Sequence, residues 1–239
     1  MKLIYTSGIA TAVVVTLAVL IALTPFLSQN NKNLIVFTFT LNDNVTDGWC
    51  DELSSFLSDN NIKATVFLSG KIAEENTHCV KSFSRDVDIG TQTFSYTDWN
   101  SDNYSIQLTE VQKGKESVDR IGNLITKSFK APYGKTDDNI YSILSRSNIV
   151  ADFSYTTQFN KWENNQFVKY DSVLISAADL TPQSVKDQIS AKSEVPVFLD
   201  FSNDIPLSDI KNIILNLNSS SMTFVNVSEL TGLDLTESK

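Results

Sequence analysis

The fold of this chain is best read outward from the stretch Ile62-Lys63-Ala64-Thr65-Val66-Phe67-Leu68-Ser69-Gly70. Residues 64–68 are apolar or β-branched without interruption, a pattern that predicts a buried strand. An earlier apolar run at residues 34–37 predicts another buried strand. Between the two runs, one face of a helix would carry Trp49, Leu53, Phe56 and Leu57. Strand, helix and strand in this order indicate a parallel pair covered by a helix.

The alternation of strands and helices continues to the end of the chain. Short apolar runs predict strands at residues 87–89, 129–131, 149–151, 173–175, 195–199 and 222–225. A long helix is expected from about residue 105 to residue 125, and two shorter ones carry the stripes Ile140, Ile143 and Leu144, and Ile210, Ile213, Ile214 and Leu217. About seven or eight mostly parallel strands covered by helices predict an α/β fold with a closed or nearly closed barrel. No repeat or internal boundary divides residues 34–239, so a single domain is expected.

An uncharged segment, residues 8–27, precedes this pattern. As a helix of about 20 residues it would span roughly 30 Å, the hydrocarbon thickness of a bilayer. It is longer than the core of most signal peptides and lacks a clean cleavage site, which favours a transmembrane signal anchor over a cleaved signal. Residues 1–7 would then be cytoplasmic, residues 28–33 a linker, and the domain would lie outside the cell membrane. If the segment is cleaved, the protein is secreted.

Charge and cysteine content narrow the partners and the compartment. Beyond the apolar segment, 18 basic residues stand against 28 acidic ones with no basic cluster, which excludes nucleic acid as a natural partner. The chain has two cysteines, Cys50 and Cys79. They either form a disulfide, as an exterior location favours, or remain two buried thiols.

Four landmarks occur in order along the chain: Phe37-Thr38-Phe39-Thr40-Leu41-Asn42, residues 62–70, Asp88-Ile89-Gly90 and Ala131-Pro132-Tyr133-Gly134. In order and spacing they resemble the NodB-like polysaccharide deacetylases over roughly residues 34–200. The resemblance implies a distorted (β/α) barrel of about seven strands, with its chemistry in the loops at the carboxyl ends of the strands.

The residues that perform the family's chemistry are replaced in this chain. Active members carry a general base and a metal-binding aspartate where Thr40 and Leu41 stand, and two histidine ligands where Gln92 and Tyr96 stand. Leucine offers no donor atom, and amide and phenol groups are poor zinc ligands. A threonine hydroxyl is far too weak a base to take a proton from water. The chain has one histidine, His78, so no two-histidine site can form. The family would use a divalent metal such as zinc, but with these ligands replaced we expect neither a metal nor another cofactor in this chain.

The remaining family positions support the same expectation. The arginine that orients the base corresponds to Lys130, and the late histidine that acts as general acid should fall near Asp200 or Phe201. Tyr133 is retained, and in active members its backbone N–H stabilises the oxyanion formed during hydrolysis. An oxyanion donor without a nucleophile contributes little.

Two questions remain open at the level of sequence. Four carboxylates at strand ends, Asp98, Asp152, Asp200 and Asp204, offer an alternative acid and base pair, although such aspartates ordinarily cap helices and turns. The cleft is either filled by its substituted side chains or open for a glycan that would stack on the aromatic residues Phe94, Tyr96, Trp99, Tyr133, Tyr155 and Trp162.

The sequence thus predicts an externally exposed, membrane-anchored deacetylase-like domain without catalytic residues. It would bind a cell-surface polysaccharide or serve as a structural module. An active carbohydrate deacetylase or hydrolase with relocated catalytic residues is the first alternative. An accessory subunit that binds a membrane-protein partner is the second.

Overall fold

The computed structural model describes residues 34–83, 87–98, 103–192, 194–218 and 222–239. Residues Asn33–Lys239 group into one compact unit. The predicted cytoplasmic segment, anchor and linker, residues 1–33, lie outside the described residues, as does Trp99. In the part of the chain that is described, no helix combines the length and the apolar character that a bilayer crossing requires.

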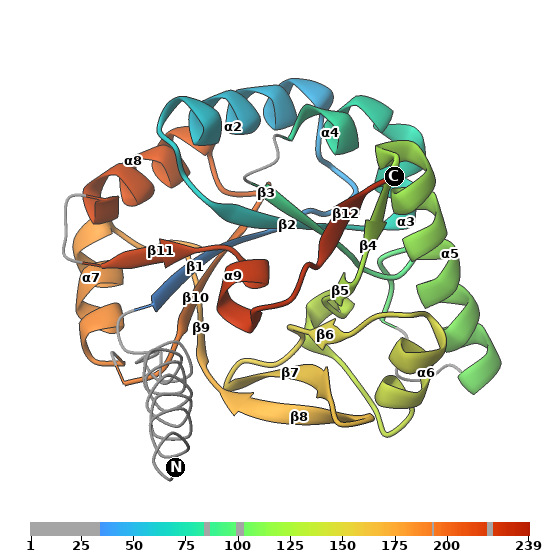
Figure 1. Ribbon diagram of the computed structural model, residues 1–239. Helices are drawn as coiled ribbons and strands as arrows, with labels where there is room; N and C mark the ends of the chain where they lie inside the picture. Colours follow the sequence, from blue (N-terminus) through green and yellow to red (C-terminus); the bar gives the residue numbers. More distant parts are fainter. Residues whose placement is uncertain (1–33, 84–86, 99–102, 193, 219–221) are drawn as a thin grey trace, which may run out of the picture. The chain divides into compact units, whose positions relative to one another are not determined.

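A central sheet of parallel strands forms the framework (Figure 1). Seven of its strands follow one another in the order β6-β5-β3-β2-β1-β10-β9, and all of these pairs are parallel. Their bounds are Leu34–Thr40 (β1), Ala64–Leu68 (β2), Val87–Thr91 (β3), Ser128–Phe129 (β5), Ala151–Asp152 (β6), Val173–Ser176 (β9) and Val197–Ser202 (β10). A further strand, β11 (Thr223–Val225), pairs with the start of β1. The predicted α/β barrel of about seven strands is confirmed in its architecture.

The sheet comes close to closing on itself. The backbone N–H groups of Ser172 and Leu174 donate to the carbonyls of Thr157 (3.1 Å) and Thr156 (2.8 Å), which joins the segment after β6 to the edge strand β9. Between them, the antiparallel hairpin β7 (Gln158–Glu163) and β8 (Gln166–Asp171) extends the sheet beyond β6. The result is a nearly closed barrel.

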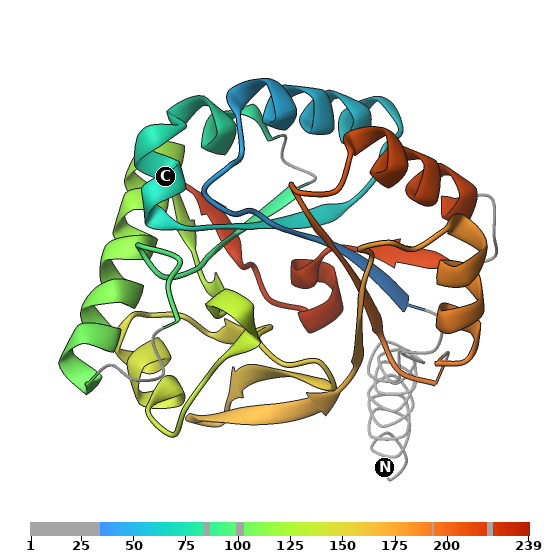
Figure 2. The ribbon, with the colours of Figure 1, turned by 180° about the vertical axis from the view of Figure 1, so that it is seen from behind.

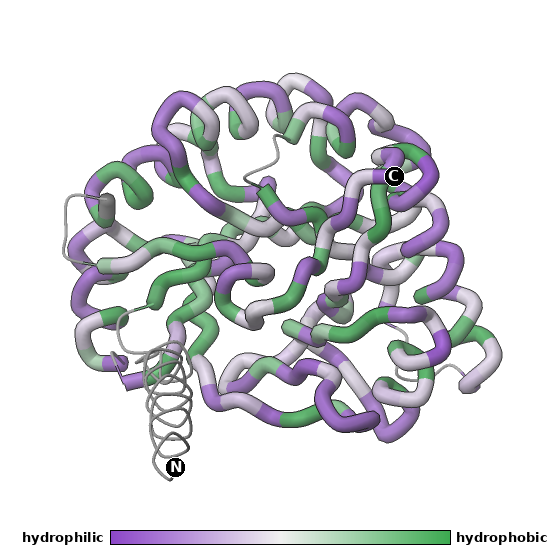
Figure 3. The backbone as a smooth tube through the Cα atoms, in the orientation of Figure 1, coloured by the Kyte–Doolittle hydropathy of each residue, from purple (hydrophilic) through white to green (hydrophobic). Residues whose placement is uncertain are grey.

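Helices surround this sheet in Figures 1 and 2. They are α2 (Asp47–Asp59), α3 (Gly70–Glu75), α4 (Thr77–Ser82), α5 (Tyr104–Gly122), α6 (Ile140–Arg146), α7 (Pro182–Ser190) and α8 (Leu207–Asn218). Green apolar segments alternate with purple polar ones along α5 and α8 in Figure 3, as expected of helices with one buried face. The short helix α9 (Val227–Thr231) lies over the centre of the strands in Figure 1.

The alternation of side chains along β1 separates two cores. Ile35, Phe37 and Phe39 face the outer helices and belong to the largest apolar cluster. Val36 faces inward, where it packs with Phe67 of β2 and with side chains of β6, β7, β10 and α9. Because side chains alternate between faces along a strand, Thr38 and Thr40 lie on the same inward face as Val36. The barrel interior is therefore apolar at one end and polar at the other.

The glycine of the third landmark is explained by the inner core. A Cβ atom at Gly90 would lie 2.4 Å from the ring of Phe67, closer than any real contact. Only glycine lets this phenylalanine fill the barrel at that level. The landmark thus reflects packing.

One expected helix needs correction, and one hairpin was missed. The predicted helix 105–125 ends at Gly122, because Asn123 adopts a left-handed conformation (φ 53°) that terminates it. Ile125 lies instead in β4 (Leu124–Thr126), which pairs with β12 (Thr236–Ser238). The hairpin β7–β8 was not predicted, although Asn164 and Asn165 both have positive φ, as a two-residue hairpin turn requires. The pair Asn164-Asn165 is a sequence pattern that could have indicated this hairpin turn.

Candidate functional site

A cleft of about 640 Å³ opens among the loops at the carboxyl ends of the strands. Its walls carry hydroxyl and amide groups, two tyrosines (Tyr96 and Tyr133), one lysine (Lys130) and three carboxylates (Asp43, Asp200 and Asp204). Two apolar side chains, Ala131 and Leu174, complete the lining that bears on its chemistry. The cleft is therefore polar with an aromatic pair.

The floor of the cleft is a closed hydrogen-bond network. The hydroxyls of Thr38 and Thr40 donate to Oδ1 of Asp200 at 2.7 and 2.8 Å. The ammonium of Lys130 lies 2.7 Å from the same oxygen and donates to the Thr40 hydroxyl at 2.8 Å. The register of β1 against β10, which pairs Thr38 with Asp200, brings these groups together. The hydroxyl of Thr40, the counterpart of the family's base, thus already donates a hydrogen bond to a carboxylate.

Lys130 is held firmly in this position. Its side chain is 7% exposed, and its ammonium lies 6.0 Å from the centre of the Phe67 ring beneath it. A buried ammonium needs a counter-charge, and Asp200 supplies it. Where an arginine would orient a base, this lysine instead neutralises an acid.

Gln92 is fully buried and committed to the backbone. Its amide nitrogen donates to the carbonyls of Phe67 (3.0 Å) and Leu41 (3.2 Å). These two acceptors fix the orientation of the amide, since its oxygen could not face two carbonyls. The oxygen is buried, and no partner for it occurs among the described residues. Gln92 does not line the cleft.

Leu41 is also fully buried, and its side chain belongs to the core between the sheet and the outer helices. It continues the outward row of β1 after Phe39. The aspartate that it replaces would need a charged partner there. Both Leu41 and Gln92 are therefore sealed in the wall.

Tyr96 takes a third position. Its backbone has a positive φ of 52°, and its ring lies 5.2 Å from that of Tyr133 at an interplanar angle of 51°. Burial, with smaller contributions from Tyr133, Asp200, Asp204 and Asp43, raises the pKa of the Tyr96 phenol to about 12. The phenol therefore stays neutral at physiological pH.

These observations decide whether the family's metal fits. The three ligand positions present a core leucine, an amide whose nitrogen is occupied, and a neutral phenol. Zinc takes thiolate, imidazole or carboxylate donors, and none of the three is one of these. Among the residues that the structure describes, no cluster of three or more histidine, cysteine or acidic side chains could hold a metal ion. The residues present do not fit the family's metal.

The Ala-Pro-Tyr-Gly landmark forms the short 3-10 turn Pro132–Gly134 at the rim. Tyr133 and Gly134 both have positive φ, and a Cβ atom at Gly134 would lie 2.9 Å from the carbonyl of Ser154. The hydroxyl of Ser154 accepts from the N–H of Ala131 at 2.8 Å and so fixes the start of the turn. The side chain of Tyr133 is left 64% exposed at the mouth of the cleft.

The four alternative carboxylates are not brought together. Asp200 lies in the floor, and Asp204 lies at the mouth, where it accepts from the Asn42 amide at 2.6 Å. Asp98 is outside the lining and forms an exposed ion pair with Lys135. Asp152 is fully buried, also outside the lining, and burial raises its pKa to about 6. Sequence reasoning missed Asp43, which the loop directly after β1 places in the cleft.

The aromatic residues separate in the same way. Tyr96 and Tyr133 line the cleft, whereas the Phe94 ring lies under the Lys113 ammonium and the Tyr155 hydroxyl is 3.2 Å from that of Tyr141. Trp162 lines a different hollow, beside Val150 and Leu233. The cleft is therefore filled on the side of Leu41 and Gln92, which are buried, and open on the side of Tyr96 and Tyr133, which line it.

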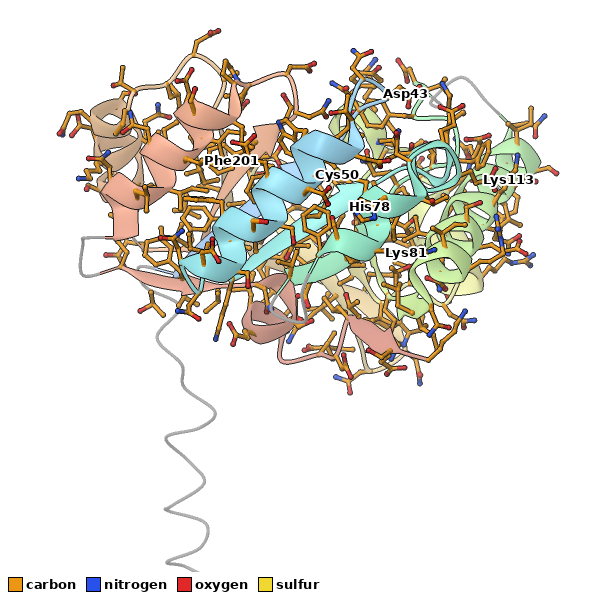
Figure 4. All side chains as sticks on the ribbon, turned by 90° about the horizontal axis from the view of Figure 1, so that it is seen from above. Asp43, Cys50, His78, Lys81, Lys113 and Phe201 are labelled. Carbon is orange, nitrogen blue, oxygen red and sulfur yellow. A yellow bond between two sulfur atoms is a disulfide. The ribbon has the colours of Figure 1, made fainter. Side chains whose placement is uncertain are left out.

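Away from the cleft, Cys50 of α2 and Cys79 of α4 form a disulfide. Figure 4 places Cys50 and His78 on these neighbouring helices. The exposed imidazole of His78 lies 2.8 Å from the carboxylate of Asp51, also on α2. The one histidine of the chain therefore takes no part in the cleft.

Comparison with known proteins agrees with the landmarks. The sequence profile described as polysaccharide deacetylase matches residues 28–151. No curated protein matches the chain.

Solved structures with the same fold include a pseudoenzyme of the CE4 family from Bacillus anthracis, with a TM-score of 0.64 and 15% identity, over 84% of this chain and 66% of that one. A mutant of that pseudoenzyme, described as having restored enzymatic activity, has a TM-score of 0.65 and 15% identity over 84% of this chain and 68% of that one. A mutant of a peptidoglycan deacetylase from Bacillus subtilis has a TM-score of 0.60 and 14% identity, over 86% of this chain and 93% of that one. At these identities the similarity shows the fold alone.

Proposed function

We propose that this chain, which belongs to the polysaccharide deacetylase family, holds a cell-surface glycan in its cleft without hydrolysing it. The observation that carries this proposal is the engagement of the former catalytic positions. Thr40 is bonded between Lys130 and Asp200, Gln92 is bonded to backbone carbonyls, and Leu41 belongs to the core. Each position has a structural partner in place of a catalytic one.

Hydrolysis of an acetamide needs a group that takes a proton from the attacking water. Oδ1 of Asp200 already accepts from two hydroxyls and faces an ammonium, so this oxygen is poorly placed for that task. Asp204 at the mouth accepts a hydrogen bond from the uncharged amide of Asn42, and no imidazole from the described residues lines the cleft with it to act as the general acid. These contacts support binding without turnover.

The open part of the cleft suits a sugar. Tyr133 exposes most of its ring at the rim, and Tyr96 packs against it from inside. The apolar face of a pyranose ring packs on such aromatic surfaces, while hydroxyls and amides around it supply hydrogen bonds. Its volume of about 640 Å³ lies within the roughly 300–1,000 Å³ typical of clefts that bind small ligands.

The proposal includes an extracytoplasmic location, with residues 8–27 as the membrane anchor. The disulfide between Cys50 and Cys79 supports it, because disulfides persist in oxidising compartments. Protease accessibility of the domain on intact cells is the direct measurement, and protection of the domain from added protease would contradict this part of the proposal.

The loss of catalysis is tested on purified protein. Acetate release from N-acetylglucosamine oligomers and zinc content are measured side by side with an active family member. We expect no release above the uncatalysed rate and no stoichiometric zinc. Turnover without zinc would instead favour relocated catalytic residues, and turnover with about one zinc per chain would overturn the proposal outright.

Glycan binding is tested with the variant Tyr133→Ala. Removal of one stacking ring should weaken binding of cell-wall oligosaccharides about fivefold, since a ring contact contributes on the order of 1 kcal/mol. The control is Ile106→Ala, which removes another exposed apolar side chain, 47% exposed, outside the cleft lining. If the parent protein binds the glycan and both variants bind it with the same affinity, the glycan binds outside the cleft.

A further inference from the structure

We propose that the cleft prefers glycans with free, protonated amino groups over their N-acetylated counterparts. This inference rests on the proposed glycan-binding function and specifies its ligand class. The reason is the balance of charge around an otherwise neutral sugar site.

Among the described residues of the lining, three carboxylates face one ammonium, that of Lys130. Lys130 is buried and already neutralises Asp200, so it offers no free positive charge. Asp204 is bonded to the neutral amide of Asn42. No cationic side chain among the described residues forms an ion pair with Asp204, so a ligand ammonium could do so at the mouth of the cleft.

Asp43 is balanced only in part. The Lys71 ammonium lies 2.7 Å from its carboxylate, but both side chains are more than a third exposed (39% and 36%). Exposed pairs of this kind are weak, so a ligand ammonium can compete for the carboxylate. Lys71 itself does not line the cleft.

The three carboxylates line one cleft together with the Tyr96 phenol. Burial first, then Tyr133 and the charges of Asp200, Asp204 and Asp43, raise the pKa of that phenol, in agreement with this proximity. The negative potential is concentrated inside the cleft, where a bound ligand would lie.

The aromatic pair reinforces the preference. Tyr96 and Tyr133 lie 5.2 Å apart, and the exposed ring of Tyr133 offers a face to a cation. An ammonium over such a ring is attracted by the negative electrostatic potential of the ring face. An acetamido group carries no charge to balance the carboxylates, and among the described lining residues its methyl group could contact two aliphatic side chains, Ala131 and Leu174.

The test is isothermal titration of the full chain with a glucosamine hexamer and, separately, an N-acetylglucosamine hexamer. It is performed at low salt and about pH 6, where amines with pKa values near those of α-amino groups, about 8, are protonated. We expect the glucosamine hexamer to bind at least tenfold more tightly, and added NaCl to reduce this difference.

Matched variants attribute the preference to the cleft. Asp204→Asn keeps the shape of the side chain and should reduce the preference several-fold, with Asp43→Asn as a second, independent variant. The control is Asp59→Asn, which removes an exposed carboxylate at the far end of α2. Thermal unfolding verifies that each variant is folded.

The outcomes separate the two proposals. Equal or tighter binding of the acetylated hexamer overturns the amino-sugar preference and leaves glycan binding intact. A preference unchanged in both folded cleft variants also overturns it. Absence of binding for both hexamers contradicts glycan binding itself.

Discussion

The two sides of the cleft differ in what became of the family's residues. On the sealed side, Leu41 and Gln92 are fully buried and bonded or packed within the wall. On the open side, Tyr96, Tyr133 and Asp204 line the hollow. Substitution at a catalytic position can thus close a site or leave its outline, depending on which neighbours receive the new side chain.

Restoring an aspartate on the sealed side should have the largest effect. Leu41→Asp places a carboxylate in the apolar core without a partner and should reduce the free energy of unfolding by about 4 kcal/mol or more. The volume-conserving control Leu41→Met should change it by less than about 1.5 kcal/mol. Urea unfolding measures both. If Leu41→Asp is tolerated at neutral pH without added metal, the side is not sealed.

The second prediction concerns the floor between the two sides. Lys130→Met removes the counter-charge of Asp200 and should destabilise the protein by about 3 kcal/mol, because a partly buried carboxylate, 17% exposed, loses its ion-pair partner. Adding Asp200→Asn to this variant should recover much of the loss. A double mutant that is as unstable as the sum of the single mutants would show that the two residues do not act as a pair.

The third prediction contrasts Asp200 with Asp152, a buried carboxylate that forms no ion pair with a cationic side chain among the described residues. Burial raises the pKa of Asp152 from 3.8 to about 6, so the folded state retains a proton that the unfolded chain releases. The free energy of unfolding should therefore fall as the pH rises from about 4 to 7, by about 2–3 kcal/mol for this group.

Asp88 titrates in the same window, since burial also raises its pKa to about 6. Asp152→Asn and Asp88→Asn should each flatten part of the pH dependence. Urea unfolding at several pH values measures the slopes. A slope that both variants leave unchanged would contradict the assignment.

The smallest of these effects is expected at Gln92. Gln92→Leu removes a donor from two buried carbonyls and should lower the free energy of unfolding by about 1–2 kcal/mol. Gln92→Glu places an acceptor against the same carbonyls and should be more damaging at neutral pH than the leucine variant. If glutamate is the better tolerated of the two at pH 7, the amide does not face the Leu41 and Phe67 carbonyls.

Much of the fold could be predicted from local patterns. The uninterrupted apolar runs of β1 and β2 and the stripe of α8 needed only periodicity. The end of α5 and the strand β4 could not be read in this way, because Ile125 fits the helical stripe and only the left-handed Asn123 and the pairing with β12 redirect the chain. Local propensity was overruled by a distant partner strand.

The sequence predicted which catalytic residues are replaced, but it did not predict which residues line the present cleft. The residue types at positions 40, 41, 92 and 96 exclude the family's base and ligands whatever their surroundings. Asp98, Asp152, Asp200 and Asp204 are alike in sequence, yet two line the cleft, one is exposed outside it and one is buried. Asp43 was missed because nothing in its local sequence distinguishes it from a turn aspartate.

The sequence by itself determined the ancestry of the chain and the absence of the family's catalytic side chains, because both depend on residue identity and order. The tertiary structure alone decided which side of the cleft is sealed and how its charges are balanced. Gln92 meets the carbonyl of Leu41 across 51 residues, and Thr40 meets Asp200 across 160. Contacts over such separations follow from strand order and register, which no local pattern specifies.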